Sequence, residues 1–283
     1  MDDGPQAGHA QEPAPPPLMR PSEAIADVRI RFPTRGNRRL ESLLEATNAD
    51  DQLKGWWHVA QANALRLGMS DHSWVHIQIV VNIALRLLRL LVRRGVEGAM
   101  VRDYAMNARD SEVVVAAASL LHDTGMSIHR TDHEAYSLFL AAMKLQSLLA
   151  RAYDEPERSV VAAEAMHAII AHRRRGDPLT LEAGVVRVAD ALDMAKGRSR
   201  IPFEAGRTNI HSLSAAAIDE VRIDAGEEKA VRIEIEMNNS SGIFQVDELL
   251  ATKLRGSGLE DHVEVVARIE AEHEKRLVPM FRL

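Results

Sequence analysis

Residues 119–133 read SLLHDTGMSIHRTDH, so a run of apolar residues ends on an adjacent histidine and aspartate. The preceding run VVVAAASLL is apolar all round, which predicts a buried helix closed by His122 and Asp123. Gly125 is expected to end that helix. Because an ionised carboxylate in apolar surroundings needs a cation or several hydrogen-bond donors, the position of Asp123 indicates a chemical purpose.

A further histidine is predicted to point into the core from residues 74–92, WVHIQIVVNIALRLLRLLV. Polar residues in this segment are spaced four, four and three apart, which predicts one solvent-exposed face of an amphipathic helix. They are Gln78, Asn82, Arg86 and Arg89. His76 lies off that face, and is either a core histidine satisfied by its neighbours or a ligand.

Asp190 raises the same question as Asp123, because it lies between apolar residues in VVRVADALDMA. A helix cap would explain one such aspartate, but two of them together with inward histidines favour a shared divalent metal. Eight of the twelve histidines lie between His58 and His172, which supports a cluster. The chain has no cysteine, so any metal is held by His, Asp and Glu. Such ligands suit one or two ions of Mn, Fe, Co, Ni, Zn or Mg.

The order of these residues resembles the HD superfamily of metal-dependent phosphohydrolases over roughly residues 57–205. The resemblance rests on HDTG at the end of a buried helix, with His76 46 residues before His122 and Asp190 67 residues after Asp123. Within the superfamily, four stretches look most like the HD domain of ribonuclease Y and its stand-alone relatives. These are HDTGM, His133-Glu134, IIAHRRRGD and VADALDMAKGRSR.

The resemblance implies a mainly α fold, an HD-domain helical bundle, and a set of metal ligands. A first ion would be bound by His76, His122, Asp123 and Asp190. A second would be bound by Asp123, His133 and His172, with Asp123 bridging both ions and orienting the attacking water.

Some positions depart from the family's pattern. Thr124 and Met126 stand where the relatives have Ile and Lys after the HD pair. The double histidine of the relatives is His172-Arg173 here, so one imidazole is missing. His167, five residues earlier, either replaces that imidazole as a metal ligand or merely packs within its helix.

Residues 173–200 contain seven basic and four acidic residues, a local charge of +3 in a chain of −6. Positive charge beside the metals would suit a phosphate ester. Lys196 and Arg198 are expected to stabilise charge on the phosphoryl oxygens, and Arg200 and Arg173 to contact the substrate. The alternative is an ordinary solvated helix end, where basic residues are favoured.

The remaining histidines have weaker assignments. His129 is either a loop residue or the acid that protonates the leaving group. His72 is expected in the loop before the His76 helix or behind a metal ligand. The others are expected to be ordinary: His58, His211, His262 and His273.

The periodicity beyond position 210 changes from helix to strand. VRIEIEM at 231–237 alternates apolar and charged residues, and Val221 and Ile223 alternate likewise, which predicts a β-hairpin. A helix at about 246–254 and a possible third strand at 263–269, VEVVARI, follow. The predicted organisation is a disordered Pro-rich tail at 1–21, a helical HD domain at 22–209 and a small α/β subdomain at 210–283.

These patterns predict hydrolysis of a phosphoester of a nucleotide, short oligonucleotide or RNA by metal-activated water. The rival interpretations are a nucleotide-binding regulatory protein that retains the metal site, and a metal-stabilised scaffold. A homodimer through the C-terminal subdomain or the HD domain is expected, because an open sheet edge can pair across a two-fold axis. The acidic start resembles no signal peptide and the apolar runs are short, which predicts a cytoplasmic protein without membrane association.

Overall fold

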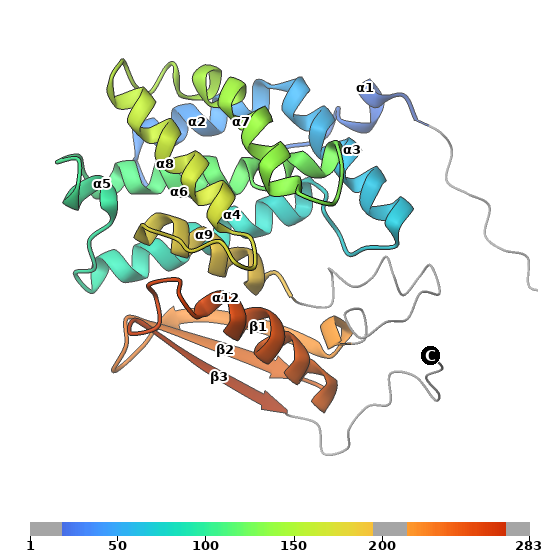
Figure 1. Cartoon of the computed structure of the whole chain (residues 1–283), viewed down its shortest axis with the longest axis vertical. Helices are drawn as coiled ribbons and strands as arrows, with labels where there is room; N and C mark the ends of the chain where they lie inside the picture. Colours follow the sequence, from blue (N-terminus) through green and yellow to red (C-terminus); the bar gives the residue numbers. More distant parts are fainter. Residues whose placement is uncertain (1–18, 195–213, 270–283) are drawn as a thin grey trace, which may run out of the picture.

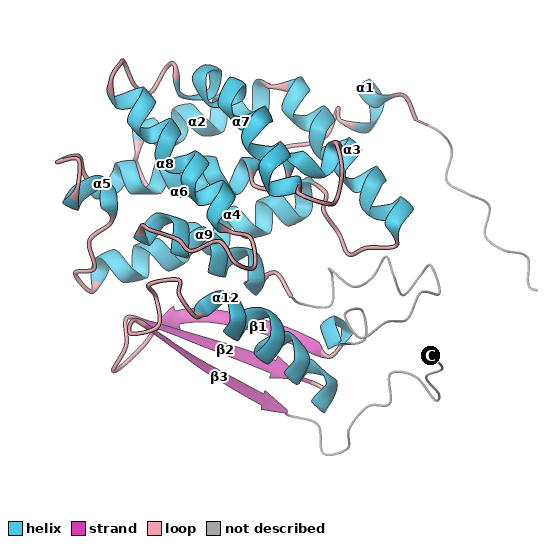
Figure 2. Ribbon diagram, viewed as in Figure 1, coloured by secondary structure: helices cyan, strands magenta, loops and turns pink. Residues whose placement is uncertain are grey.

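The computed structural model describes residues 19–194 and 214–269, which form a helical body and a small three-stranded sheet (Figures 1 and 2). The helical body consists of α1 (Pro21–Ala24), α2 (Arg38–Ala49), α3 (Asp51–Leu67), α4 (Trp74–Arg93), α5 (Ala99–Arg102), α6 (Ala108–Leu121), the 3-10 helix η1 (Thr124–Ser127), α7 (His133–Leu149), α8 (Glu157–Ala171) and α9 (Leu181–Leu192). The predicted fold class, a helical bundle with a small α/β subdomain, is confirmed.

Side-chain caps explain where α2, α3, α4, α6 and α9 begin. In each of these five helices, a side-chain oxygen at the N-cap position accepts a hydrogen bond from a backbone N–H in the first turn, which would otherwise lack a partner. The N-cap residues are Asn37 for α2, Asp50 for α3, Ser73 for α4, Asn107 for α6 and Thr180 for α9. The start of α4 is therefore fixed three residues before His76.

The helix α6 is the centre of the body, as its apolar sequence predicts. Every residue from Val113 to Leu121 is fully buried, and α6 packs against α2, α4, α8 and α9. The indole Nε1 of Trp57 on α3 donates a hydrogen bond to the carbonyl oxygen of Leu120, at 3.1 Å. Because α6 is enclosed on all sides, the His-Asp pair that follows it is held inside the protein.

The helix α4 shows that the predicted solvent face was wrong in part. Arg89 is only 9% exposed and pairs with Glu112 on α6, with Nε 2.7 Å from Oε1. Gln78 and Asn82 bind the backbone of Arg31, and Arg86 bonds to the backbone of Ile223 in the sheet. These polar side chains join α4 to neighbouring segments of the chain, which a periodicity argument cannot distinguish from contact with water.

The same helix is long and apolar enough to cross a membrane by length and composition, the one such helix in the described residues. No single apolar run in the sequence had indicated this, because polar residues interrupt α4. In the structure, 56% of its most apolar window is buried inside the protein, and it packs between α6 and α9. Such burial is typical of a core helix.

The predicted β-hairpin and third strand are confirmed. The strands β1 (Ile218–Ala225) and β2 (Val231–Met237) pair antiparallel, and β3 (Val263–Ile269) pairs parallel to β2. The apolar residues of β2 are buried, whereas the alternate residues carry charges such as Arg232 and Glu234, which pair with each other. The buried face belongs to the same core as the helical body, so the sheet needs no other partner to cover it.

A helical segment connects β2 to β3 and lies between the sheet and α9. It follows the short 3-10 turn η2 (Ser240–Gly242) and consists of the π-helix η3 (Gln245–Ala251) and α12 (Thr252–Leu254). We call residues 245–254 the subdomain helix. It contacts α9 along both parts, as the position of α12 in Figure 1 indicates. The helix predicted at about 246–254 is therefore confirmed. The boundary predicted at 209/210 and most of the predicted tail lie outside the described residues.

Candidate metal centre

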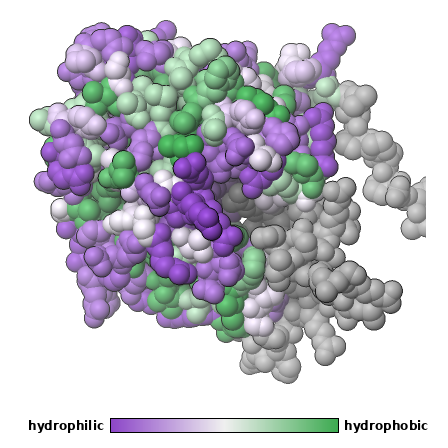
Figure 3. Space-filling model, in the orientation of Figure 1, coloured by the Kyte–Doolittle hydropathy of each residue, from purple (hydrophilic) through white to green (hydrophobic). Residues whose placement is uncertain are grey.

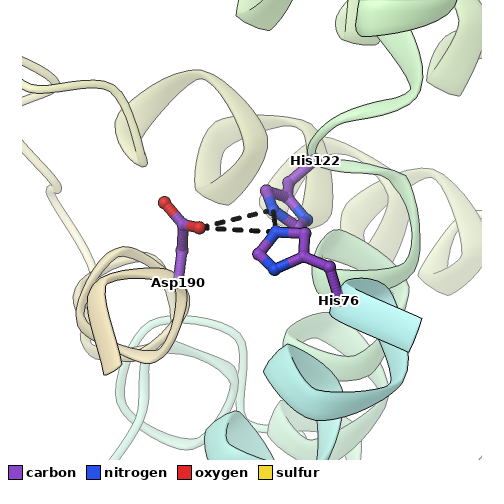
Figure 4. Close-up of side chains that lie close together, drawn as sticks. All are labelled: His76, His122 and Asp190. Atoms are coloured by element: carbon purple, nitrogen blue, oxygen red, sulfur yellow. Dashed lines mark hydrogen bonds and ion pairs between the residues drawn. The ribbon is translucent and has the colours of Figure 1, made fainter. Parts of the chain in front are cut away.

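Five helices bring the predicted metal ligands together at one place. His76 comes from the first turn of α4, His122 and Asp123 follow the end of α6, and Asp190 comes from the last turn of α9. Figure 4 shows His76, His122 and Asp190 pointing toward one another from three separate elements. His133 opens α7 and His172 follows α8. All six residues are buried, which few polar residues are unless they have a specific partner.

The first group consists of His76, His122 and Asp190, whose ligand atoms lie within 4.8 Å of one another. The Nε2 atoms of the two histidines are 3.3 Å apart. They lie 3.6 and 3.8 Å from Oδ1 of Asp190, and both lie 3.4 Å from Oδ2 of Asp123. Two imidazole nitrogens and two carboxylate oxygens therefore face a common point.

The second group shares Asp123. The other oxygen of that carboxylate, Oδ1, lies 3.1 Å from Nε2 of His133 and 3.8 Å from Nε2 of His172. Asp123, His133 and His172 again place their ligand atoms within 4.8 Å of one another. Since each oxygen of Asp123 faces one group, this carboxylate has the position of a bridging ligand.

The ring orientations of His76, His122 and His172 are fixed by a bond to the nitrogen that faces away from the centre. Nδ1 of His122 lies 2.9 Å from the carbonyl oxygen of Ser119, and Nδ1 of His172 lies 2.6 Å from that of Ile169. Nδ1 of His76 lies 2.6 Å from Oδ2 of Asp193. A carbonyl or carboxylate oxygen accepts, so Nδ1 carries the proton and Nε2 keeps its lone pair for the centre. This carboxylate- or carbonyl-histidine arrangement is the usual support of metal-binding histidines.

The electrostatics keep Asp123 ionised and His172 neutral. Burial on its own would raise the pKa of Asp123, but the neighbouring imidazoles of His122, His133 and His76 outweigh that effect and hold the pKa well below its usual value. Burial lowers the pKa of His172 to about 3, with His122 and Lys253 adding to the effect. Anionic carboxylate and neutral imidazole are the protonation states that bind metals. The donor set therefore fits one or two divalent ions.

The shifted pKa of His172 predicts a loss of stability in acid. An unfolded histidine binds a proton below about pH 6.5, whereas folded His172 does so only near pH 3. Between these values the unfolded chain binds more protons, so the free energy of unfolding falls as the pH falls. We expect metal-free protein in EDTA to lose stability below about pH 6.5, and His172→Gln to lose less. Urea denaturation at several pH values measures this, and equal slopes in both proteins would contradict it.

Hydrogen bonds in the turn after α6 fix the backbone around His122 and Asp123. The hydroxyl of Thr124 donates to the carbonyl oxygen of Leu121 at 2.8 Å, and that of Ser137 donates to the carbonyl oxygen of His122 at 2.6 Å. Contrary to expectation, Gly125 does not end α6: the helix ends at Leu121, and Gly125 lies within η1. A Cβ on Gly125 would lie 1.9 Å from the carbonyl oxygen of His133, so glycine lets α7 approach Asp123 closely.

A pocket of about 510 Å³ opens onto both groups and is large enough for a nucleotide-sized ligand. The described residues that line it include Asp123, His133, His172 and Asp190, with Arg130, Arg173 and Lys253 supplying positive charge. Figure 3 shows a hollow in this face of the molecule that strongly hydrophilic residues border. The predicted substrate contact Arg173 is exposed at the edge of this pocket.

Two candidate residues are not brought to the centre. His129 is exposed on the loop before α7, where its Nδ1 accepts a hydrogen bond from the backbone N–H of Thr131. His167 faces the loop before α9, because its Nε2 accepts from the backbone N–H of Leu179 at 3.0 Å. One ring nitrogen of each histidine thus binds a nearby backbone N–H. Lys196, Arg198 and Arg200, with His211 and His273, lie outside the described residues.

Three residues near the centre were missed or underrated by sequence reasoning. Asp193 supports His76, and His72 is buried with Nε2 4.0 Å from Oδ2 of Asp123. Lys253 on the subdomain helix forms an ion pair with Oδ2 of Asp190. The second aspartate of VADALD was a visible signal for Asp193, but only tertiary structure reveals Lys253, which lies 63 residues from its partner.

Comparison with known proteins agrees with this geometry. The family model described as "HD domain" matches residues 70–195, a range that contains all six ligand candidates. An uncharacterised protein of Methanocaldococcus jannaschii is 42% identical over 207 residues, which covers 73% of this chain and 80% of the relative. No solved structure matches the chain significantly. The chain therefore belongs to the HD superfamily, whose members are generally metal-dependent hydrolases.

Proposed function

We propose that the protein is a metal-dependent phosphohydrolase that cleaves a phosphoester of a nucleotide or a short oligonucleotide. The observation that carries this proposal is the division of Asp123 between two groups of imidazole and carboxylate ligands. Paired sites of this kind suit phosphoryl transfer, because two cations can stabilise both the attacking and the leaving oxygen. Members of the family are generally hydrolases, which supports the same reaction class.

The chain's own residues have distinct tasks in this reaction. His76, His122 and Asp190 would hold one divalent ion together with Oδ2 of Asp123, and Asp123, His133 and His172 would hold a second. The ions would supply Lewis acidity, which makes water a stronger nucleophile near neutral pH. Asp123 lines the pocket and would orient that water, while Arg130, Arg173 and Lys253, which also line the pocket, would attract the phosphate group. Lys196, Arg198 and Arg200 remain proposed phosphate contacts.

The substrate is tested with a panel of phosphoesters. Untagged protein loaded with Mn²⁺ is incubated with nucleoside mono-, di- and triphosphates, cyclic nucleotides, short RNA and bis(p-nitrophenyl) phosphate, and products are resolved by chromatography. We expect turnover of at least one nucleotide or oligonucleotide. If none turns over but one binds tightly in calorimetry, the protein is a nucleotide-binding regulator. Turnover of only non-nucleotide esters would overturn the substrate class.

A further inference from the structure

One face of α9 receives the subdomain helix and the loop that follows it. The contact residues on α9 are spaced three apart, Gly184, Arg187 and Asp190, and so form one row along the helix surface. Such a row fixes both where the partner segment lies along α9 and how close it comes to α9. The subdomain is thereby attached next to a predicted metal ligand.

Each member of this row holds a specific part of the partner segment. A Cβ on Gly184 would lie 2.0 Å from the carbonyl oxygen of Ser257, so only glycine permits that approach. The buried guanidinium of Arg187 donates from Nε to the carbonyl oxygen of Lys253 at 2.9 Å and from Nη2 to that of Thr252 at 3.3 Å. These carbonyls end a helix, where a cation is favoured. The backbone of Lys253 is therefore fixed against α9.

The side chain of Lys253 reaches from that anchor into the metal centre. Its Nζ binds Oδ2 of Asp190, whose Oδ1 faces the imidazoles of His76 and His122. The Lys253 side chain is 18% exposed and lines the pocket together with Gln245 and Leu249 from the same helix. A π-helix such as η3 is rare and frequently marks a functional site. One wall of the pocket thus comes from the C-terminal subdomain.

The charge of Lys253 has opposite consequences for the two ligands of this pocket. A divalent ion bound through Asp190 would share that carboxylate with the ammonium group, so Lys253 weakens binding of the ion. An anion in the pocket is attracted by the same ammonium group, which has three N–H donors. The ion pair with Asp190 is therefore a resting position from which Lys253 can turn toward an anion when a cation occupies the carboxylate.

We infer that Lys253 is a substrate-contacting residue, which binds the phosphoryl oxygens and makes the C-terminal subdomain part of the active site. This inference rests on the proposed phosphohydrolase function for the identity of the anion. A purely structural role of the Lys253–Asp190 ion pair is the alternative, and the two roles differ in one measurable respect. A structural role predicts that removing the ammonium weakens both ligands, whereas the inference predicts changes of opposite sign.

Lys253→Met separates these alternatives. Calorimetric titration of the metal-free protein with Mn²⁺ is expected to show about three- to tenfold tighter binding in the variant. Titration of the Mn²⁺-loaded protein with inorganic phosphate is expected to show about tenfold weaker binding or more. Lys253→Arg keeps the charge and is expected to retain phosphate binding. Arg255→Met, which removes an exposed cation just beyond the subdomain helix, is the matched control and is expected to change neither.

Several outcomes would overturn the inference. They are unchanged affinities in Lys253→Met, parallel loss of both affinities with a lower melting temperature, and a wild-type protein that binds no phosphate at all. Failure of the proposed function is recognised separately, because neither titration requires turnover. A protein that hydrolyses none of the esters but shows the opposite changes in Mn²⁺ and phosphate affinity would keep Lys253 as an anion-binding residue and lose only the reaction.

Discussion

Asp123→Asn is expected to lower hydrolysis by about 10³-fold or more, because loss of several kcal/mol of charge stabilisation has that effect on a rate. The amide keeps the shape of the carboxylate but lacks its charge, and Asp123 is the one residue in the described chain placed to serve both ligand groups. The rate is measured under saturating Mn²⁺ with the best ester from the substrate panel. The amide has nearly the size of the carboxylate and its oxygen still accepts hydrogen bonds, so the metal-free variant is expected to remain folded.

The matched control is Asp132→Asn, nine residues later. Asp132 is exposed, stands at the N-cap position of α7 and makes no capping hydrogen bond with its side chain. Asparagine also tolerates its left-handed backbone, with φ of 58°. This variant is expected to hydrolyse the ester at the wild-type rate. Equal activity of Asp123→Asn and Asp132→Asn would remove Asp123 from the mechanism.

Gly125→Ala is expected to destabilise the protein by about 3 kcal/mol, the upper range for forcing extra volume into a packed region. The new Cβ would lie 1.9 Å from the carbonyl oxygen of His133 and 2.5 Å from the backbone nitrogen of Ser137. Both atoms belong to the backbone of α7, so the start of that helix must move away from η1. Because His133 opens α7, the variant is also expected to bind metal more weakly at the second group.

Gly55→Ala is the control for this substitution. Gly55 lies inside α3 with no atom within 4 Å of the added Cβ, and alanine favours a helix by roughly 0.5–1 kcal/mol over glycine. Chemical denaturation should therefore show the two alanine variants changing stability in opposite directions. Similar stability of Gly125→Ala and the wild type would show that η1 and α7 are not closely packed.

Local sequence patterns predicted much of the fold and of the ligand set. The segment before His122, apolar all round, predicts α6, and alternation predicts β1 and β2, because burial imposes these patterns directly; VEVVARI indicated β3 only as a possible third strand. The inward direction of His76 follows from the period of α4. A shared metal was inferred from two aspartates in apolar surroundings and from inward histidines. The assignment of His76, His122 and Asp190 to one ligand set came from the family resemblance, since no local pattern relates one helix to another.

Other features depend on tertiary contacts that no local pattern records. Arg89 has the spacing of a solvent-exposed residue, yet Glu112 and the backbone of Pro33 enclose it. Arg187 added to the positive charge counted beside the metals, but it is buried and holds the subdomain helix. His129 and His167 have suitable spacing for ligands, but a nearby backbone N–H donates a hydrogen bond to one ring nitrogen of each. Lys253 lies in the C-terminal subdomain, whereas its partner Asp190 lies in the helical body.

The central claim is that imidazoles and carboxylates from separate helices bind a divalent cation, and metal analysis tests it most directly. Untagged wild type and Asp123→Asn are purified without chelator, passed through gel filtration and analysed by inductively coupled plasma mass spectrometry. The account predicts at least one equivalent of divalent metal per wild-type chain and almost none in the variant. A wild type that stays metal-free after dialysis against Mn²⁺, Fe²⁺, Co²⁺, Ni²⁺, Zn²⁺ or Mg²⁺, or a variant that retains equal metal, would contradict it.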